Sequence, residues 1–304
     1  MQTTNEGGIH PIYECWLNGK QHTTVPGKFY VSSLSRSARQ IVLERRHASE
    51  LKRDVLDGFK AAIGTAVHEA IEKSLRAKNV ELGWEKYLLE SPSQMEFGSY
   101  TLSGRLDCME CVDREANTWR LIDHKTRSQW SWVYYDDVAE HEYCVQLSAY
   151  KMMQEKIYGR KILPTGLIGF IMGDWKAPEN TDGKYPALPI MTKEILLMSN
   201  DEIEQYIRKW LDEIAQTDTK TDEELKPCSP AQLWQKDAWA VVHPNKSRAL
   251  KIHNNEKDAT EHAEVLGPPH RVEYRQGMAK ACNYCQCATV CSQFRGLKEK
   301  GLVG

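Results

Sequence analysis

The sequence lacks the features of a membrane or secreted protein. None of its apolar runs approaches the roughly 20 residues that a membrane-spanning helix needs. The first residues, MQTTNEGGIHPIYECW, show no basic segment followed by an apolar core, so no secretory signal is expected. The nine cysteines are an odd number, which favours reduced thiols or metal ligands over disulfides. We therefore expect a cytoplasmic protein with no membrane partner.

A strong excess of charge of one sign is also missing. The formal net charge is -2 over 304 residues, so any surface for nucleic acid must be local. The composition, 41% hydrophobic and 27% charged, is typical of a globular chain that can bury a sizeable core. One basic stretch, Ser32 to Asp54, is expected to be helical. It is either a solvated helix face or a patch that follows a nucleic-acid backbone.

Helical and strand-like periodicities alternate along the chain. Helices are expected at 57–77, 140–159 and 199–218, and strands at 99–112, 118–126, 163–175 and 185–198. After 218 we expect irregular structure that ends in a cysteine cluster. The pattern predicts an α/β or α+β fold, with a central mixed sheet flanked by helices and a C-terminal appendage. The expected parts are an N-terminal segment 1–31, a core 32–218 and a C-terminal region 219–304.

Two charged residues stand at the end of a strand that otherwise reads as buried. In TWRLIDHKT, Asp123 and Lys125 are two residues apart and therefore share one face of the strand. If this strand forms a hairpin with SYTLSGRLDCMECV, centred on Glu115, Asp107 lies directly opposite Asp123. Two carboxylates this close repel each other unless a cation lies between them or one is protonated.

A divalent metal would resolve this repulsion, because hard oxygen ligands suit Mg²⁺ or Mn²⁺. The ion could polarise a phosphoryl oxygen and activate water, while Lys125 orients or deprotonates that water or stabilises developing charge. The alternative is a salt-bridged surface hairpin. Two other pairs have helical spacing: His68 with Glu72, and Gln146 with Tyr150.

Taken in order, these motifs resemble the PD-(D/E)XK nuclease superfamily. The motifs are G-x-x-x-H ending at His68, G-x-x-D from Gly104 to Asp107, D-x-K from Asp123 to Lys125, and Q-x-x-x-Y from Gln146 to Tyr150. They are most similar to the RecB/AddB-type exonuclease branch, which includes CRISPR-associated and phage exonucleases. The resemblance implies a restriction-endonuclease-like core.

The resemblance also implies roles for these residues. It makes His68, Asp107, Asp123 and the backbone carbonyl of His124 ligands of Mg²⁺ or Mn²⁺. Lys125 would be the catalytic lysine, and Asp107 and Asp123 would be catalytic through the metal that they hold. Gln146 and Tyr150 would contact the scissile strand or order the site. A neutral imidazole ligand favours Mn²⁺ over Mg²⁺.

Four of the cysteines lie within ten residues, CNYCQCATVC: Cys282, Cys285, Cys287 and Cys291. Thiolates this dense usually hold zinc or an iron–sulfur cluster. Cluster-bearing members of the RecB-type branch use C-x2-C-x5-C, which Cys282, Cys285 and Cys291 match, with a fourth cysteine far upstream. The corresponding stretch here, SRSARQIVLER, has none. Cys287 could supply the fourth thiolate locally, or Cys15 or Cys228 could fold back. Free thiols are the remaining alternative.

The leading hypothesis is a metal-dependent DNA exonuclease that acts on single strands or duplex ends and leaves a 5′-phosphate. The resemblance implies a role in recombination, repair or phage DNA processing, with a recombination or replication protein as partner, in a bacterial or phage-infected cytoplasm. The alternatives are an endonuclease of the same fold and a non-catalytic DNA-binding protein with a metal-stapled tail. The aromatic stretch SQWSWVYYDD, Ser128 to Asp137, is a candidate base-stacking surface.

Overall fold

The computed structural model describes residues 2–18, 25–177 and 185–303, and these divide into two compact units. The sheet unit comprises Thr3–Ser35 and Arg53–Glu213. The cysteine unit comprises Met1–Gln2, Arg36–Lys52 and Ile214–Gly304. Each unit is thus built from stretches that are distant in sequence. The expected division at residues 31 and 218 stays a prediction. No helix of the described chain is long and apolar enough to cross a membrane.

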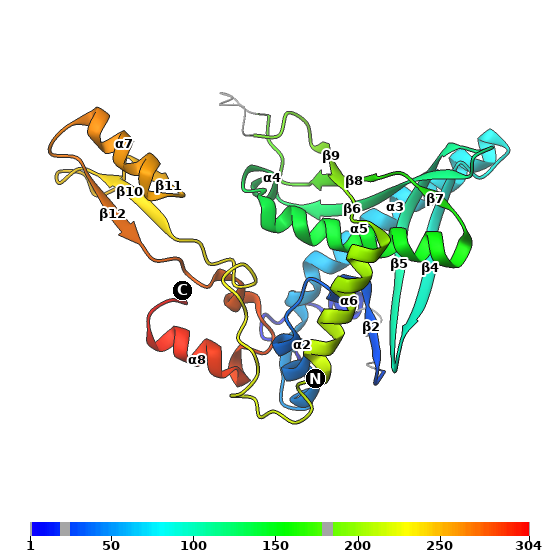
Figure 1. Ribbon diagram of the computed structural model, residues 1–304, viewed down its shortest axis with the longest axis horizontal. Helices are drawn as coiled ribbons and strands as arrows, with labels where there is room; N and C mark the ends of the chain where they lie inside the picture. Colours follow the sequence, from blue (N-terminus) through cyan, green and yellow to red (C-terminus); the bar gives the residue numbers. More distant parts are fainter. Residues whose placement is uncertain (1, 19–24, 178–184, 304) are drawn as a thin grey trace. The chain divides into compact units, whose positions relative to one another are not determined.

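A seven-stranded mixed sheet forms the centre of the sheet unit, which confirms the predicted fold class. The neighbouring strands run in the order β2, β5, β6, β8, β9, while β4 pairs with β5 and β7 pairs with β6 (Figure 1). Both parallel pairs, such as β6 with β8, and antiparallel pairs, such as β5 with β6, occur. The strands are β2 (Lys28–Tyr30), β4 (Tyr87–Phe97), β5 (Tyr100–Asp113), β6 (Thr118–Arg127), β7 (Lys161–Ile162), β8 (Thr165–Met172) and β9 (Ile190–Leu196).

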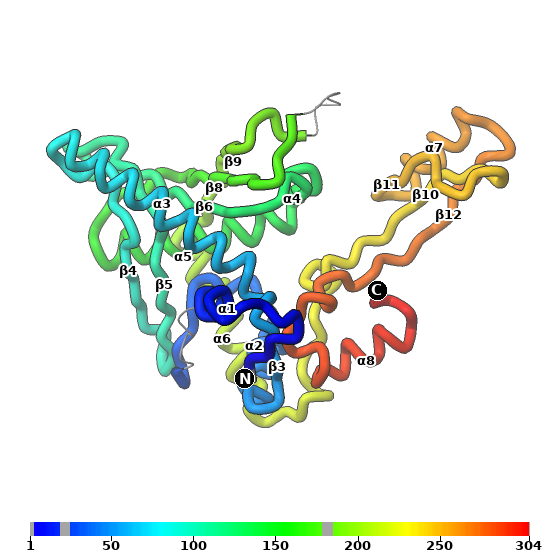
Figure 2. Tube along the Cα trace, turned by 180° about the vertical axis from the view of Figure 1, so that it is seen from behind, coloured from blue at the N-terminus to red at the C-terminus, as the bar shows by residue number. Residues whose placement is uncertain are grey.

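Two long helices cover opposite faces of this sheet, α3 (Phe59–Leu82) and α5 (Asp137–Tyr158) (Figures 1 and 2). The side chain of Asp136 caps α5 by accepting a hydrogen bond from the N–H of Ala139 at 2.9 Å. The helix ends at Gly159, whose φ of 63° suits a left-handed cap, as the sequence predicts. The core between α5 and the sheet includes the fully buried side chains Leu102, Leu106, Met109, Leu121, Leu147, Met152, Ile168 and Phe170.

The remaining elements of the sheet unit are short, apart from one helix. They are α1 (Pro11–Asn18), the 3₁₀ helices η1 (Val31–Ser33) and η2 (Val55–Gly58), α4 (Gln129–Val133) and α6 (Asn200–Ala215), most of which belongs to this unit. Two strands at its boundary, β1 (Gln2–Thr4) and β3 (Lys52–Asp54), form a separate two-stranded sheet. The helices expected at 57–77, 140–159 and 199–218 are therefore confirmed as α3, α5 and α6, with small shifts of their ends.

The predicted register of the central hairpin is confirmed. Cys108 pairs with Ile122, and Glu110 pairs with Arg120, so Asp107 and Asp123 are the next positions along the two strands. Beyond them the partners diverge. Strand β5 continues beside β2 at Thr101 to Ser103, whereas β6 continues beside β8. The two strands therefore part at the two aspartates, which leaves both carboxylates at the end of the shared ladder.

Two expectations about the helices and strands of this region are wrong. The stretch from Ser32 to Asp54 is not one helix, because Ser37 caps a short α2 (Ala38–Arg46) by accepting a hydrogen bond from Gln40 at 3.1 Å, and the chain leaves the helix at His47. Strand β4 was also not predicted from the sequence. Pro92 interrupts its pattern, and a proline is tolerated there because β4 is an edge strand of the sheet.

The cysteine unit contains more regular structure than the sequence predicts. Residues after 218 were expected to be irregular, but β10 (Ala238–Val242), β11 (Lys251–His253) and β12 (Arg271–Arg275) form an antiparallel sheet beside α7 (Glu256–Leu266). These strands are short, and β11 and β12 are largely exposed, so their apolar periodicity is weak. The cysteine segment follows as two 3₁₀ turns, η3 (Lys280–Tyr284) and η4 (Ala288–Val290), before α8 (Ser292–Glu299).

Candidate active site

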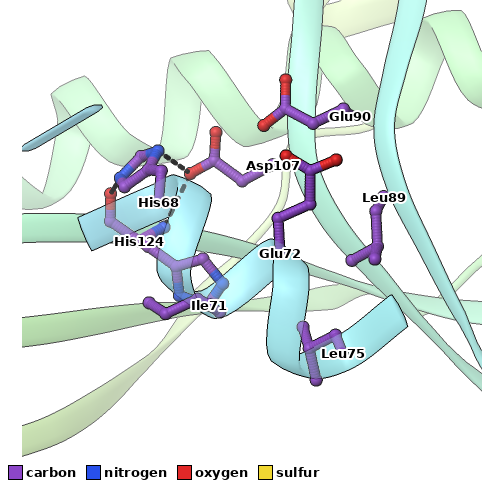
Figure 3. Close-up of a pocket in the computed structure, with 8 residues that line it drawn as sticks. All are labelled: His68, Ile71, Glu72, Leu75, Leu89, Glu90, Asp107 and His124. Atoms are coloured by element: carbon purple, nitrogen blue, oxygen red, sulfur yellow. Dashed lines mark hydrogen bonds and ion pairs between the residues drawn. The ribbon is translucent and has the colours of Figure 1, made fainter. Parts of the chain in front are cut away.

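The carboxyl group of Asp107 lies between two groups from different elements. Its Oδ2 accepts a hydrogen bond from the backbone N–H of His124 at 2.9 Å and lies 3.5 Å from Nδ1 of His68 on α3 (Figure 3). Burial, followed by the nearby charge of Asp123, raises the pKa of Asp107 to about 6. The expected repulsion between the two carboxylates is therefore present in the folded chain.

Asp123 is almost fully buried, with 2% of its surface exposed. Its Oδ1 accepts a hydrogen bond from Nε2 of Gln146 at 3.0 Å, and its Oδ2 lies 2.8 Å from the ammonium of Lys125. Oδ2 has no well-aligned hydrogen-bond donor, so this contact is an ion pair alone. The ammonium in turn donates to Oε1 of Gln146 at 3.2 Å. Asp123 and Lys125 do share one face of β6, and α5 supplies the amide that links them.

His68 reaches the site from the other face of the sheet. Its Nε2 lies 2.7 Å from the backbone oxygen of His124, so it donates to that carbonyl when this nitrogen is protonated. The carbonyl proposed as a ligand therefore points toward the predicted ligands His68 and Asp107. Burial lowers the pKa of the His124 imidazole.

Tyr150 plays a different part from the carboxylates. Its hydroxyl donates to the backbone oxygen of Arg105 at 3.0 Å, on the stretch of β5 that lies between its pairing with β2 and its pairing with β6. Burial raises the pKa of Tyr150, so the phenol stays protonated and keeps this bond. A side chain at Gly104 would place its Cβ 2.7 Å from the ring of Tyr150. The glycine of the G-x-x-D motif thus allows the tyrosine to pack against β5.

Two acidic residues beside the site were not predicted as site residues. Glu72 and Glu90 line a small pocket together with His68, Asp107 and His124, and their carboxylates lie near Asp107 (Figure 3). Burial, followed by the charge of Glu72, raises the pKa of Glu90. The spacing of four residues between His68 and Glu72, which places both on one face of a helix, could have predicted Glu72. No sequence pattern indicated Glu90, because it lies on β4, a strand that was not predicted. Its φ is 50°.

The donors fit a hard divalent cation. Asp107 lies with His68 and the backbone of His124, while Asp123 lies with Lys125 and Gln146. These groups include the carboxylate, carbonyl and imidazole ligands that such an ion accepts, and the buried Oδ2 of Asp123 lacks an aligned hydrogen bond. Within the described ranges, no three His, Cys, Asp or Glu side chains lie close enough together to hold a metal ion as they stand. In the folded chain, Lys125 contacts the carboxylate of Asp123, and His68 contacts the carboxylate of Asp107 and the carbonyl of His124. These are the oxygens that are expected to bind such an ion.

The structure places the predicted cysteine ligands in the cysteine unit. Cys285 and Cys291 pack against an apolar cluster that includes the buried Cys287, and Sγ of Cys285 lies 3.8 Å from Sγ of Cys287. Cys282 belongs to a neighbouring cluster, against which Cys228 packs. Cys15 lies exposed in α1 of the sheet unit. All nine thiols are free.

The aromatic stretch after β6 is partly exposed. Trp130 stacks on Tyr134 with ring centroids 5.9 Å apart, and their exposed fractions are 44% and 73%. Trp132 and Tyr135 instead pack against the core residue Phe170. Two of the four aromatics thus remain available for stacking with bases.

One comparison with known proteins identifies a family. The model of the PD-(D/E)XK nuclease superfamily matches residues 28–292. Among solved structures, the chain is similar to SSO0001, with 16% identity, 70% of this chain and 89% of that chain covered, and a TM-score of 0.45. It is also similar to a phage-related exonuclease from Haemophilus somnus 129PT, with 14% identity, 62% and 95% covered, and a TM-score of 0.37. A search of curated proteins finds no match.

Proposed function

The chain belongs to the PD-(D/E)XK nuclease superfamily, and from this premise we propose that it is a divalent-metal-dependent DNA exonuclease acting on single strands or duplex ends. The observations that support the proposal are the contact of Asp107 with His68 and the contact of Asp123 with Lys125, beside the point where two strands part. Burying a carboxylate and an ammonium costs free energy, and a role in phosphodiester hydrolysis would explain why both groups are present.

In this proposal His68, Asp107, Asp123 and the carbonyl of His124 would hold Mg²⁺ or Mn²⁺. When bound, the ion supplies Lewis-acid polarisation of the phosphate and a more acidic water. Lys125 orients or deprotonates the attacking water, or stabilises the negative charge that develops on the phosphoryl oxygens. Its ammonium is already directed at the site by its contacts with Asp123 and Gln146.

Gln146 and Tyr150 hold this arrangement in place. The amide of Gln146 bridges Asp123 and Lys125, so it fixes the separation of the acid and the cation. Tyr150 fixes the carbonyl of Arg105 and with it the course of β5 toward Asp107. Both are positioning contacts in the metal-free protein. The exposed pair Trp130 and Tyr134 is the proposed base-stacking surface.

The test is the degradation of end-labelled linear and covalently closed circular single-stranded DNA in the presence of Mn²⁺. We expect wild type to degrade the linear substrate alone, and Lys125→Ala to lose this activity. Lys209→Ala is the matched control, because Lys209 is an exposed lysine on α6 of the same unit. It should leave cleavage unchanged.

Each other outcome has a defined meaning. Cutting of the circle would indicate an endonuclease of the same fold. Binding of DNA without cleavage would indicate the non-catalytic alternative. Equal cleavage by wild type and Lys125→Ala would contradict the assignment of the site. Replacing DNA by RNA of the same sequence tests the choice of nucleic acid, and we expect no comparable degradation.

A further inference from the structure

A buried cation lies beside the cysteines and has no carboxylate partner in the described chain. Arg39 on α2 is only 3% exposed. Its guanidinium donates to the backbone oxygen of Leu225 at 2.7 Å, to Oγ of Ser292 at 2.6 Å and to Sγ of Cys291 at 3.4 Å. Of these three groups, only Cys291 can carry a negative charge. A buried guanidinium is costly unless an anion compensates it, and a metal-bound Cys291 thiolate would supply that anion.

Cys228 is fixed next to the C-terminal cysteines by a double hydrogen bond. Its N–H donates to Oε1 of Gln293 at 2.8 Å, and its carbonyl accepts from Nε2 of the same side chain at 3.0 Å. Gln293 follows Cys291 by two residues. The Cys228 side chain packs against the cluster that contains Cys282. The backbone of Cys228 is therefore tied to the segment of one predicted ligand, and its side chain packs against the cluster that contains another.

The surroundings of the Cys228 sulfur suit a ligand. Sγ lies 3.1 Å from Oγ of Ser37, a hydroxyl that can donate to a thiolate. Cys282 lies in the apolar cluster against which Cys228 packs, and Cys285 and Cys291 pack against the other apolar cluster of the unit. These four thiols thus share one region, and a positive metal centre would remove their mutual repulsion.

Cys287, the local candidate for a fourth ligand, lies in less suitable surroundings. Its sulfur is 3.5 Å from the carbonyl oxygen of Gln40 and 3.9 Å from the carboxylate of Glu44. A thiolate at this position would face two electron-rich oxygens. The thiol can instead remain protonated and donate to the Gln40 carbonyl, which accounts for its burial without any metal.

The spacing of the thiols bears on the kind of metal centre. In the described part of the cysteine unit, no three of them lie close enough around one point to hold a single ion such as zinc. A cluster of several irons and sulfides spans a larger space and still binds four cysteine thiolates. We propose that Cys228, together with Cys282, Cys285 and Cys291, holds an iron–sulfur cluster, that Arg39 is its buried counter-charge, and that Cys287 is not a ligand.

The proposal is independent of nuclease activity and is tested by metal content. The full chain is purified without oxygen and assayed for iron, acid-labile sulfide and the visible absorbance of thiolate-bound iron. Wild type should contain iron and sulfide in equal amounts. Cys228→Ser should lose both, and Cys287→Ser should keep both. The two substitutions are matched, because each replaces one thiol of the same unit with a hydroxyl, and circular dichroism checks that each variant is folded.

A thiol exchange separates loss of a ligand from loss of structure. Because Oγ of Ser37 lies 3.1 Å from Sγ of Cys228, adding Ser37→Cys to Cys228→Ser places a thiol at almost the same point. This double variant should regain iron and sulfide. The proposal is overturned if Cys228→Ser keeps its iron, if Cys287→Ser loses as much as Cys228→Ser, or if wild type holds zinc or no metal.

Discussion

Replacing Asp107 with asparagine should stabilise the metal-free protein at neutral pH. Burial and the charge of Asp123 raise the pKa of Asp107 from 3.8 to about 6, so ionisation of this carboxyl opposes folding. An asparagine has the same size and still offers an oxygen to the N–H of His124, which now donates to Oδ2 at 2.9 Å. The substitution therefore removes the charge while it keeps the packing and this hydrogen bond.

The magnitude follows from the two pKa values of 3.8 and about 6. At about 1.36 kcal/mol for each pKa unit, the difference corresponds to roughly 3 kcal/mol. The folded state holds this proton more tightly than the unfolded state. The stabilisation is therefore fully present below about pH 3.8 and is lost as the pH rises through about 6. At about pH 8 the free energy of unfolding of the asparagine variant should exceed that of wild type by up to roughly 3 kcal/mol. This difference corresponds to a melting temperature about 5–10 °C higher.

The assay is thermal unfolding with a metal chelator at about pH 4 and about pH 8. The two proteins should differ at the higher pH and match at the lower one. Asp212→Asn is the control, because Asp212 is an exposed carboxylate on α6 of the same unit, and it should change neither value. Added Mn²⁺ should stabilise wild type and leave the asparagine variant almost unaffected. An asparagine variant that is no more stable than wild type at the higher pH would refute the reasoning.

Three further predictions concern packing, charge and metal preference. Gly104→Ala should lower the free energy of unfolding, measured with urea, by about 1–3 kcal/mol, because the added Cβ would meet the Tyr150 ring at 2.7 Å. Gly64→Ala has open space around the added Cβ, so it should raise the free energy of unfolding by about 0.5–1 kcal/mol. Arg39→Met should make the reduction potential of the proposed cluster more negative in an anaerobic titration, since a buried cation favours the reduced form; an unchanged potential would contradict the counter-charge role. Wild type should cleave faster with Mn²⁺ than with Mg²⁺, and His68→Ala should narrow this gap; equal wild-type rates would count against His68 as a ligand.

Local pattern was sufficient to predict the centre of the candidate site. Strand residues two apart share a face, so the spacing of Asp123 and Lys125 alone predicted their contact, which the structure gives as 2.8 Å. The hairpin centre expected at Glu115 gave the register of β5 and β6, whose ladder ends at Cys108 and Ile122, next to Asp107 and Asp123. Helical spacing likewise predicted that Gln146 and Tyr150 project together from α5.

Local pattern failed where burial depends on distant segments. Periodicity predicted helix α3, but Phe59 at its start is 49% exposed and none of the helix's residues is fully buried. Periodicity shows which residues share a face, but not how closely another element covers it. Glu90 lies on the edge strand β4, which was not predicted because Pro92 interrupts its pattern. It reaches the site only because β4 pairs with β5 along its length.

The sequence by itself determined the order of the elements, the register of the central hairpin and the residue types at the candidate site, since all of these follow from neighbours close in the chain. Only the tertiary structure decided which distant groups meet. It placed Cys228 beside Ser37 across 191 positions and buried Arg39 against Cys291 across 252. Contacts over such separations depend on how whole elements pack, and no short-range period in the sequence encodes them.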